Sequence, residues 1–234
     1  MTQFFGMKKN PFDKHGTDAR EAFTCHDHTE MQKRLHFLIK AGGLGIFTAP
    51  PGMGKTYALH CFAADLNPTL YTTAYVNLTT VGRREFHSVI CEALGLETAG
   101  RRCALFSRIH ARVTKLRDET RKPLILMVDE ARHLHPKILD DLKLLMNFDY
   151  NSRNCFTLVL LGEPQLNGLL SRPSLESLRQ RITVHYNFCG LTKKRISTSC
   201  TSSALPVLRL TLSIQLSPWL FTESAAAIPD RLAA

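Results

Sequence analysis

Short apolar runs alternate with longer amphipathic segments along the chain as far as about residue 190. In the longer segments apolar residues recur at every third or fourth position, which is the period of a helix with one buried face. The short runs are apolar throughout, as strands are when both faces of a sheet are covered. Such alternation is typical of parallel strands joined by helical crossovers, so we expect a three-layer α/β sandwich with a central parallel sheet. The predicted strands are residues 45–48, 72–78, 124–128, 157–161 and 183–188, and the predicted helices are residues 29–40, 56–66, 84–94, 104–121, 137–146 and 175–181.

The pattern changes after residue 191. Residues 191–218 contain no acidic residue, no aromatic residue and no glycine, and Ser and Thr dominate there. Neither the helical nor the strand period persists, and a weak helical pattern returns only in residues 221–228, FTESAAAI. We therefore divide the chain into an α/β domain, residues 1–192, and a region of different character, residues 193–234.

A glycine-containing loop follows the first predicted strand, where residues 49–56 read APPGMGKT. A loop that holds phosphate needs small residues so that backbone N–H groups can point inward, then a Lys for the terminal phosphates and a hydroxyl for Mg²⁺. Lys55 and Thr56 stand at these places, while Ala49 stands where the strict pattern has Gly. Taken alone, the eight residues would also fit an ordinary turn between a strand and a helix. The candidate nucleotide-binding residues are Ala49, Pro50, Pro51, Gly52, Met53, Gly54, Lys55, Thr56 and Tyr57.

Two carboxylates end another apolar run, LILMVDEA, residues 124–131. The pattern places Asp129 and Glu130 at the carboxyl end of a buried strand, which is where ligands bind in parallel sheets. We expect Asp129 and Thr56 to hold Mg²⁺, and Glu130 to orient and deprotonate the attacking water, because phosphoryl transfer is mostly positioning and charge neutralisation. An Asp-Glu pair after an apolar run is common by itself. Joined to the phosphate loop, it predicts a site that binds and hydrolyses ATP with Mg²⁺.

Six segments occur in the order found in one known group of proteins. They are FFGMKKNPF, APPGMGKT, VDEARHL, LKLLMNF, LVLLGEPQL and LRQRI. In this order they resemble the AAA+ ATPases of the ExeA (general secretion pathway protein A) and TnsC type, and the resemblance covers about residues 1–192. It implies a P-loop NTPase fold with the phosphate loop after the first strand, a small helical lid, and oligomers in which one subunit completes the site of the next. Many members of the group are encoded beside transposases or integrases.

The resemblance implies roles for four further residues. Similar proteins place a polar sensor of the γ-phosphate after the strand FTLVLLG, and here Glu163 and Gln165 are the candidates. A carboxylate near phosphate would be unfavourable unless it faces away. Arg181 or Arg179 in LRQRI resembles the arginine finger that is offered across a subunit interface, where a guanidinium stabilises transition-state charge. For both arginines the alternative is a solvated position on a helix.

The lid is where the sequence departs most from this group. Similar proteins follow residue 191 with an acidic helix and a helical bundle that bears a second sensor arginine, whereas here GLTKK runs directly into the Ser/Thr-rich stretch. A local change of reading frame between about residues 193 and 217 and true divergence both fit the sequence. We expect residues 193–234 to be a truncated or degenerate lid, frame-shifted or disordered in part. Such a lid puts the prediction of hydrolysis in doubt, whereas the prediction of nucleotide binding does not depend on it.

The chain is strongly basic. Thirty Lys and Arg against 20 Asp and Glu give a formal net charge of +10. This balance favours a polyanionic partner such as double-stranded DNA, through long-range attraction and counterion release. The pairs Arg83–Arg84 and Arg101–Arg102 and the run Lys193–Arg195 are candidate phosphate contacts. The alternative is a basic surface with no such partner.

Cysteine spacing indicates the cellular compartment of the protein, and hydropathy indicates whether it is anchored in a membrane. The seven cysteines are spread singly, nothing resembles a signal peptide, and no spacing matches a zinc framework. We therefore expect a reduced cytoplasmic location. Residues 204–221 are apolar but contain Arg209, Gln215 and two prolines, so they fall short of the roughly 20 mostly apolar residues of a membrane helix. We expect no membrane anchor.

These observations favour an ATP-dependent switch that regulates DNA transposition or integration. MgATP binding would favour a DNA-bound homo-oligomer that contacts a transposase or integrase, and hydrolysis would release it. The main alternative is a secretion-pathway assembly ATPase of the ExeA type, which would normally carry a transmembrane helix and a periplasmic region after the ATPase. A third alternative, suggested by the altered lid, is a nucleotide-binding remnant without turnover.

Overall fold

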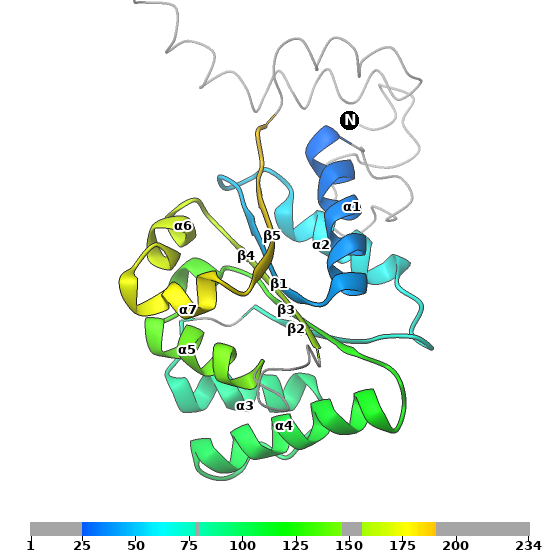
Figure 1. Cartoon of the computed structure of the whole chain (residues 1–234), viewed down its shortest axis with the longest axis vertical. Coiled ribbons are helices and arrows are strands. Elements are labelled where there is room, and N and C mark those ends of the chain that lie inside the picture. The colour runs from blue at the N-terminus through cyan, green and yellow to red at the C-terminus, as the bar shows by residue number, and fades with distance from the viewer. Residues whose placement is uncertain (1–24, 78–79, 147–155, 191–234) are drawn as a thin grey trace, which may run out of the picture. The chain divides into compact units, whose positions relative to one another are not determined.

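The computed structural model describes residues 25–77, 80–146 and 156–190, and these belong to one unit that spans Ala22–Gly190. Figure 1 shows a single sheet in this unit with helices on both sides. Several predictions fall outside the described residues: the degenerate lid in residues 193–234, the motif FFGMKKNPF, the run Lys193–Arg195, and Leu78 at the end of the second predicted strand.

Five parallel strands form the sheet, in the order β2-β3-β4-β1-β5. All five predicted strands are present, with ends displaced by two residues at most. The predicted α/β fold with a central parallel sheet is therefore confirmed. Because β4 lies between β1 and β3, the loops that follow these three strands meet at one edge of the sheet. The strands are β1 (Gly43–Thr48), β2 (Thr72–Val76), β3 (Leu124–Val128), β4 (Phe156–Gly162) and β5 (Ile182–Asn187).

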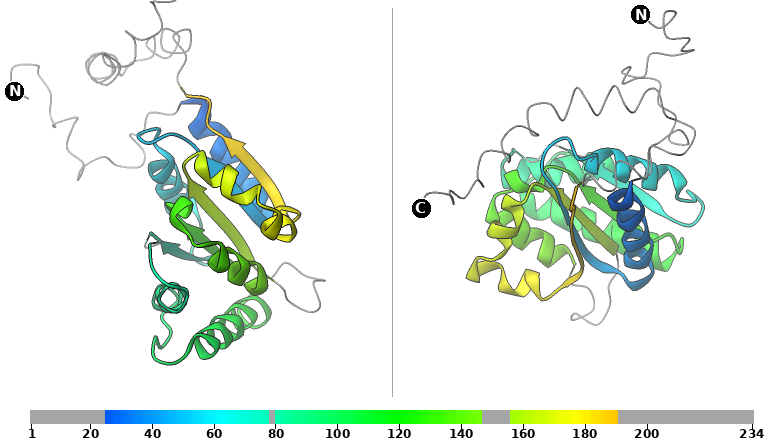
Figure 2. Two further views of the ribbon diagram at one scale, coloured as in Figure 1. Left: turned by 90° about the vertical axis from the view of Figure 1, so that its left-hand side faces the viewer. Right: turned by 90° about the horizontal axis from the view of Figure 1, so that it is seen from above.

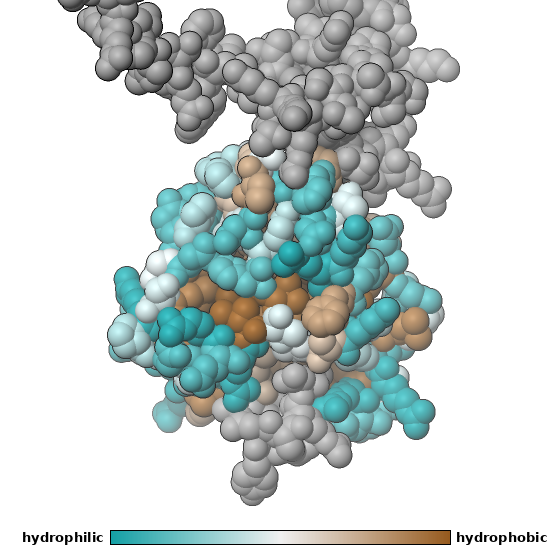
Figure 3. Space-filling view, turned by 45° about the horizontal axis from the view of Figure 1, so that its top comes forward, coloured by the Kyte–Doolittle hydropathy of each residue, from teal (hydrophilic) through white to brown (hydrophobic). Residues whose placement is uncertain are grey.

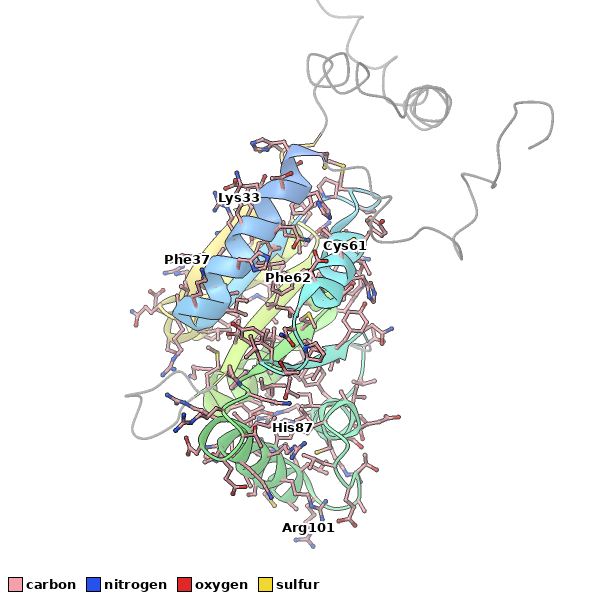
Figure 4. All side chains as sticks on the ribbon, turned by 90° about the vertical axis from the view of Figure 1, so that its right-hand side faces the viewer. Lys33, Phe37, Cys61, Phe62, His87 and Arg101 are labelled. Carbon is pink, nitrogen blue, oxygen red and sulfur yellow. The ribbon has the colours of Figure 1, made fainter. Side chains whose placement is uncertain are left out.

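Helices cover both faces of the sheet, as Figures 1 and 2 show. The helices α1 (His26–Ala41) and α2 (Lys55–Asp65) pack on one face, and the remaining helices pack on the other. Figure 4 shows α1 and α2 side by side, with Phe62 of α2 directed toward α1. The remaining elements are α3 (Arg83–Ala93), α4 (Arg102–Asp118), α5 (Pro136–Leu145), α6 (Gln165–Leu170) and α7 (Glu176–Arg179), with the 3₁₀ turns η2 (Ala131–His133) and η4 (Pro173–Leu175).

The core is divided in two by the sheet. Side chains alternate along a strand, so the two faces of β3 contribute to different clusters. Leu124, Leu126 and Val128 belong to the cluster under α3 to α7, and Ile125 and Met127 belong to the cluster under α1 and α2. Burial on both faces explains why the strands are apolar throughout in the sequence.

Helix predictions were less accurate at three places. Helix α6 was not predicted, because six residues are too few to show a helical period. The predicted helix at residues 175–181 is a 3₁₀ turn followed by the short α7, which ends at Arg179. Helix α4 ends at Asp118 rather than at Arg121. Arg121 adopts a left-handed φ of 54°, and Lys122 N–H donates to the Leu116 carbonyl at 2.9 Å, which is a cap that stops the helix.

Helices α3, α4 and α5 meet at a buried carboxylate. Asp141 is 1% exposed and accepts hydrogen bonds from Arg83, at 3.0 and 2.6 Å, and from Arg102, at 2.9 Å. The buried imidazole of His87, on α3, lies 3.8 Å from the same carboxylate (Figure 4). Arg83 and Arg102 are therefore engaged by Asp141. This corrects the expectation that both basic pairs are presented to phosphate, since Arg83 and Arg102 are bonded to Asp141 and Arg84 Nε donates to the Gly100 carbonyl at 3.0 Å.

The start of α1 is tied to the exit of β5. Asp27 is 4% exposed and accepts hydrogen bonds from the Tyr186 hydroxyl at 2.6 Å and from the Gly190 N–H at 2.8 Å. Burial raises the pKa of Asp27, but these hydrogen bonds outweigh burial and leave the pKa below its ordinary value. The Arg34 guanidinium lies 4.6 Å from the centre of the Tyr186 ring. The chain is thus held where it leaves the sheet.

Crossing a bilayer takes a long, apolar helix, and the described part of the chain contains none.

Candidate nucleotide-binding site

The loop between β1 and α2 has a backbone suited to phosphate. Gly52 and Gly54 have φ angles of 78° and 79°, in the left-handed region that residues with a Cβ rarely adopt. A Cβ at either position would meet no atom within 4 Å, so glycine is needed here for its conformation and not for space. Helix α2 begins directly afterwards, at Lys55, so its first N–H groups and positive dipole end face the loop.

Lys55 is turned back on its own loop. The side chain is buried, and Nζ donates to the carbonyl oxygens of Ala49, at 2.8 Å, and Pro50, at 3.2 Å. These two acceptors satisfy an ammonium group that would otherwise be costly to bury. A phosphate in the loop would offer charged acceptors in exchange, and hydrogen bonds between charged groups are the stronger kind.

Thr56 and Asp129 are brought together from positions 73 apart in the sequence. The Thr56 hydroxyl donates to Asp129 Oδ2 at 2.6 Å, and the Tyr75 hydroxyl donates to the same oxygen at 3.1 Å. The other oxygen, Oδ1, accepts from the Glu130 N–H at 2.8 Å. Asp129 is 3% exposed. The two residues predicted to hold Mg²⁺ are therefore neighbours, and the carboxylate is held in place by three donors.

Tyr75 is a member of this site that sequence reasoning missed. Its strand, β2, lies beside β3 in the sheet, where Tyr75 pairs with Met127 two positions before Asp129. Burial raises the pKa of Tyr75 to about 12, and the Asp129 carboxylate adds to the effect. The phenol therefore stays protonated and donates to Asp129 throughout the neutral range. No local motif marks Tyr75, because its role follows from the order of strands.

The residues at this place fit Mg²⁺ bound together with a nucleotide. Mg²⁺ prefers oxygen ligands and is usually held by one or two protein groups plus substrate phosphates and water. Thr56 and Asp129 supply two such oxygens. Within the described ranges, no group of three or more His, Cys, Asp and Glu residues could hold a metal ion. A metal at this site would accordingly need the phosphate oxygens of the nucleotide as further ligands.

Glu130, the candidate base, has an unusual backbone. Its φ and ψ are 51° and 36°, in the left-handed region, and it begins the 3₁₀ turn η2. Residues other than glycine persist in this region only where the surroundings hold them there, often at functional sites. The Glu130 carboxylate lies 3.6 Å from Arg132 Nε. Glu130 thus stands at the carboxyl end of β3, directly after the Asp129 carboxylate.

Glu163 directly follows β4, the strand that lies between β1 and β3 in the sheet. Its side chain is buried and forms an ion pair with Arg132 Nη1. This partner was not anticipated, and it removes the objection to a carboxylate at this place because the charge is neutralised. Gln165, the other sensor candidate, is the exposed first residue of α6.

Arg179 and Arg181 lie at the opposite edge of the sheet from the phosphate loop. Ile182, which follows them, pairs with Leu44 at the start of β1, whereas the loop follows Thr48 at its end. Leu44 and Ala49, the first residue of the loop, are five residues apart, which is about 17 Å along a strand at 3.3 Å per residue. An arginine side chain cannot span that distance. Neither arginine can reach the phosphate loop of its own chain, so a role at such a loop would require a second copy.

A polar network adjoins the loop and was also missed. Asn167 Nδ2 donates to Thr48 Oγ1 at 3.3 Å and to Asn187 Oδ1 at 3.0 Å, and the Thr48 hydroxyl donates to Asn187 as well. Directly after Thr48, the Ala49 N–H donates to the Gly162 carbonyl at 3.1 Å. The ends of β1, β4 and β5 are thereby joined to one another and to α6 where the phosphate loop begins. The members of this polar network come from separate segments of the chain, so no sequence motif identifies them.

Figure 3 shows the surface of the unit with the top of Figure 1 turned forward. Hydrophobic residues gather in the middle of the face and hydrophilic residues surround them. Tyr57, directly after Thr56, keeps 37% of its surface exposed.

The fold and the site together define a P-loop protein of the AAA+ ATPase class. The family model described as AAA domain matches residues 39–170, more than half of the chain, and the chain belongs to this family. Among curated proteins it is similar to General secretion pathway protein A of Aeromonas hydrophila, with 31% identity over 199 residues. That alignment covers 83% of this chain and 36% of the relative. The predicted relation to the ExeA group is confirmed at the level of an AAA+ ATPase.

Solved structures share the fold. Cdc6p of Pyrobaculum aerophilum matches with a TM-score of 0.59 and 19% identity, over 75% of this chain and 48% of that chain. The ORC1 protein of Aeropyrum pernix in complex with DNA matches with a TM-score of 0.58 and 18% identity, over 84% of this chain and 56% of that chain. This chain thus spans 36% of the curated relative and about half of these two solved proteins.

Proposed function

We propose that this chain binds MgATP between the phosphate loop and the end of β3, and hydrolyses it. The observation that carries the proposal is the Thr56–Asp129 contact of 2.6 Å, which joins the helix after the loop to the strand that ends in Glu130. The family supports nucleotide binding in general. The assignment of individual residues rests on the geometry of the site.

Each residue has a definable task in this proposal. Lys55 exchanges the carbonyls of Ala49 and Pro50 for phosphate oxygens. Thr56 and Asp129 would hold Mg²⁺, which supplies neutralisation of phosphate charge when it is bound. Glu130 orients the attacking water and accepts its proton. Arg179 or Arg181 of a second copy would stabilise the transition-state charge, since neither can reach the loop of its own chain.

Nucleotide binding and turnover are tested separately. Lys55→Ala is expected to abolish binding of a fluorescent ADP analogue, because the loop loses its only positive side chain. Glu130→Gln is expected to retain that binding and lose phosphate release. The matched control is Lys33→Ala, an exposed lysine on the outer side of α1 in Figure 4, which should change neither. Unchanged phosphate release in Glu130→Gln would reject the assigned base, and ADP binding without any turnover in the wild type would favour the nucleotide-binding remnant.

We further propose that the ATPase acts as a nucleotide-dependent, DNA-bound homo-oligomer that regulates transposition or integration through a transposase or integrase. The net charge of +10 supports a polyanionic partner. A solved protein with this fold is in complex with DNA. Binding of a labelled DNA duplex with and without MgATP, over a series of salt concentrations, tests the proposal. Affinity should rise with ATP and fall with salt, and no binding at low salt with ATP would reject it.

A secretion-pathway role is the second candidate. The observation in its favour is the 31% identity to General secretion pathway protein A. The two candidates differ in what the chain should bind, because a secretion role does not require ATP-dependent affinity for DNA. Genes for secretion components beside the coding sequence would favour this role, whereas a transposase or integrase gene there would favour the DNA switch.

A further inference from the structure

Arg132 links two carboxylates at the carboxyl edge of the sheet. Its Nη1 is paired with Glu163 Oε2, and its Nε lies 3.6 Å from Glu130 Oε2. The Glu163 side chain is 9% exposed, whereas that of Glu130 is 44% exposed. One partner is therefore buried and closely paired, and the other is half-exposed and more loosely held.

The position of Arg132 is fixed by its surroundings. The turn η2 lies so close to β4 that a Cβ on Gly162 would come within 3.3 Å of the Arg132 backbone nitrogen. Arg132 Nε also donates to His133 Nε2 at 2.8 Å. If the guanidinium left Glu163, a buried carboxylate would lose its counter-charge, which is strongly unfavourable. Arg132 is thus anchored on Glu163, and Glu130 meets an arginine that does not readily move away.

The contact between Arg132 and Glu130 opposes the task proposed for Glu130. A general base must direct a lone pair at water, whereas an ion pair draws the carboxylate toward the guanidinium. We propose that Arg132 is a positioning residue that restrains Glu130, and that Glu163 sets the strength of the restraint by competing for the same guanidinium. This inference rests on the proposed ATPase function.

The arrangement leads to effects of opposite sign. Glu163→Gln leaves the charge of Arg132 to Glu130 alone, so the restraint tightens and kcat falls. Removal of Arg132 ends the restraint, so kcat rises. Because Glu163 acts only through Arg132, Glu163→Gln has no slowing effect once Arg132 is replaced.

The choice of variants follows from burial. Arg132→Gln alone leaves Glu163 buried without its partner, and such a chain can fail to fold. The double variant Arg132→Gln/Glu163→Gln avoids this, because it leaves two neutral side chains that can bond to one another. Arg132→Lys keeps a cation and should lie between wild type and the double variant. Arg172→Gln, at an exposed arginine, is the matched control.

The first measurement is steady-state phosphate release with MgATP. Relative to wild type, kcat should fall in Glu163→Gln and rise in the double variant, each by about two- to five-fold, as expected for a half-exposed ion pair. KM and the affinity for a fluorescent ADP analogue should stay within about two-fold, because only the base is affected. A kcat at or below the wild-type value in the double variant would overturn the inference.

The second measurement needs no turnover. In protein labelled with ¹³C at the glutamate carboxyl groups and measured without nucleotide, the Glu130 resonance is assigned by its loss in Glu130→Gln. It should shift in Glu163→Gln and in the double variant, and stay in place in Arg172→Gln. An unmoved resonance in the double variant would contradict the contact itself. A wild type that binds ADP and turns over ATP, but without the expected order of rates, rejects this inference alone, whereas a wild type without turnover rejects the proposed function together with it.

Discussion

Glu130 combines candidate chemistry with an unfavourable backbone. It and Arg121 are the two non-glycine residues with positive φ in the described part of the chain. A left-handed conformation costs a residue with a Cβ about 1 to 2 kcal/mol. At Arg121 this conformation ends a helix, and at Glu130 it turns the chain from the end of β3 into the 3₁₀ turn η2. Stability is reduced at a residue that the proposed reaction needs, as is common at active sites.

Glycine at either position should therefore stabilise the fold. Glu130→Gly and Arg121→Gly are each expected to raise the free energy of unfolding by about 0.5 to 1 kcal/mol. Glycine relieves the strain of the left-handed conformation, and its greater conformational entropy in the unfolded state cancels part of that gain. Thermal unfolding would show this as a rise of about 1 to 3 °C. Only Glu130→Gly should lose phosphate release. If Arg121→Gly stabilises the fold but Glu130→Gly destabilises it, the contacts of the Glu130 side chain contribute more to stability than the backbone strain costs.

At the scale of elements, Asp141 holds three helices together. It lies on α5 and is bonded to Arg83 at the start of α3 and to Arg102 at the start of α4. Burial raises the pKa of Asp141, but the hydrogen bonds of Arg83 and the charges of His87 and Arg102 outweigh burial and leave the pKa below the ordinary value of 3.8. A carboxyl group with a depressed pKa stabilises the fold at neutral pH and loses this effect in acid.

Asp141→Asn tests this cluster. At pH 7 it is expected to lower the free energy of unfolding by about 2 kcal/mol, since hydrogen bonds to a charged group are lost. In wild type the contribution of Asp141 is complete above its ordinary pKa of 3.8 and declines as pH falls through and below that value. Urea unfolding between about pH 5 and 3 should accordingly show a shallower loss of stability in the variant. Asp118→Asn, at an exposed aspartate, is the control, and equal slopes in Asp141→Asn and wild type would refute the assignment.

At the scale of the whole molecule, the sheet separates the two halves of the proposed catalytic machinery. The phosphate loop and Glu130 lie at the carboxyl edge, and Arg179 and Arg181 lie at the amino edge. If Arg179 or Arg181 stabilises the transition state as proposed, the site is completed only by a second copy, because neither arginine reaches the phosphate loop of its own chain. Activity should therefore belong to an oligomer and not to a single chain.

Mixing two inactive variants tests that requirement. Glu130→Gln lacks the base but keeps both arginines, and Arg179→Ala/Arg181→Ala lacks the arginines but keeps the base. In an equal mixture, about a quarter of the interfaces join an intact base to an intact arginine, so that share of wild-type phosphate release should return. Recovery on mixing separates a missing finger from simple damage to the fold. No recovery, with both variants folded and able to bind ADP, would exclude a shared site.

The class of fold and the main site motifs were predictable from local sequence. Buried parallel strands are apolar along their whole length, and the phosphate loop and Asp129–Glu130 follow such runs directly. These features depend on residues adjacent in the chain, so their pattern is visible without a structure. The sequence by itself thus determined the α/β class, the five strands, and the candidate roles of Lys55, Thr56 and Asp129.

Other features depended on the order of the strands, which no local pattern records. The placement of β2 beside β3 brings Tyr75 to Asp129, and the insertion of β4 between β1 and β3 brings Glu163 to Arg132. The packing of α3, α4 and α5 likewise turned Arg83 from a candidate phosphate contact into a partner of Asp141. Only the tertiary structure decided these pairings, because hydrogen bonds and ion pairs act over a few ångströms between residues far apart in the chain.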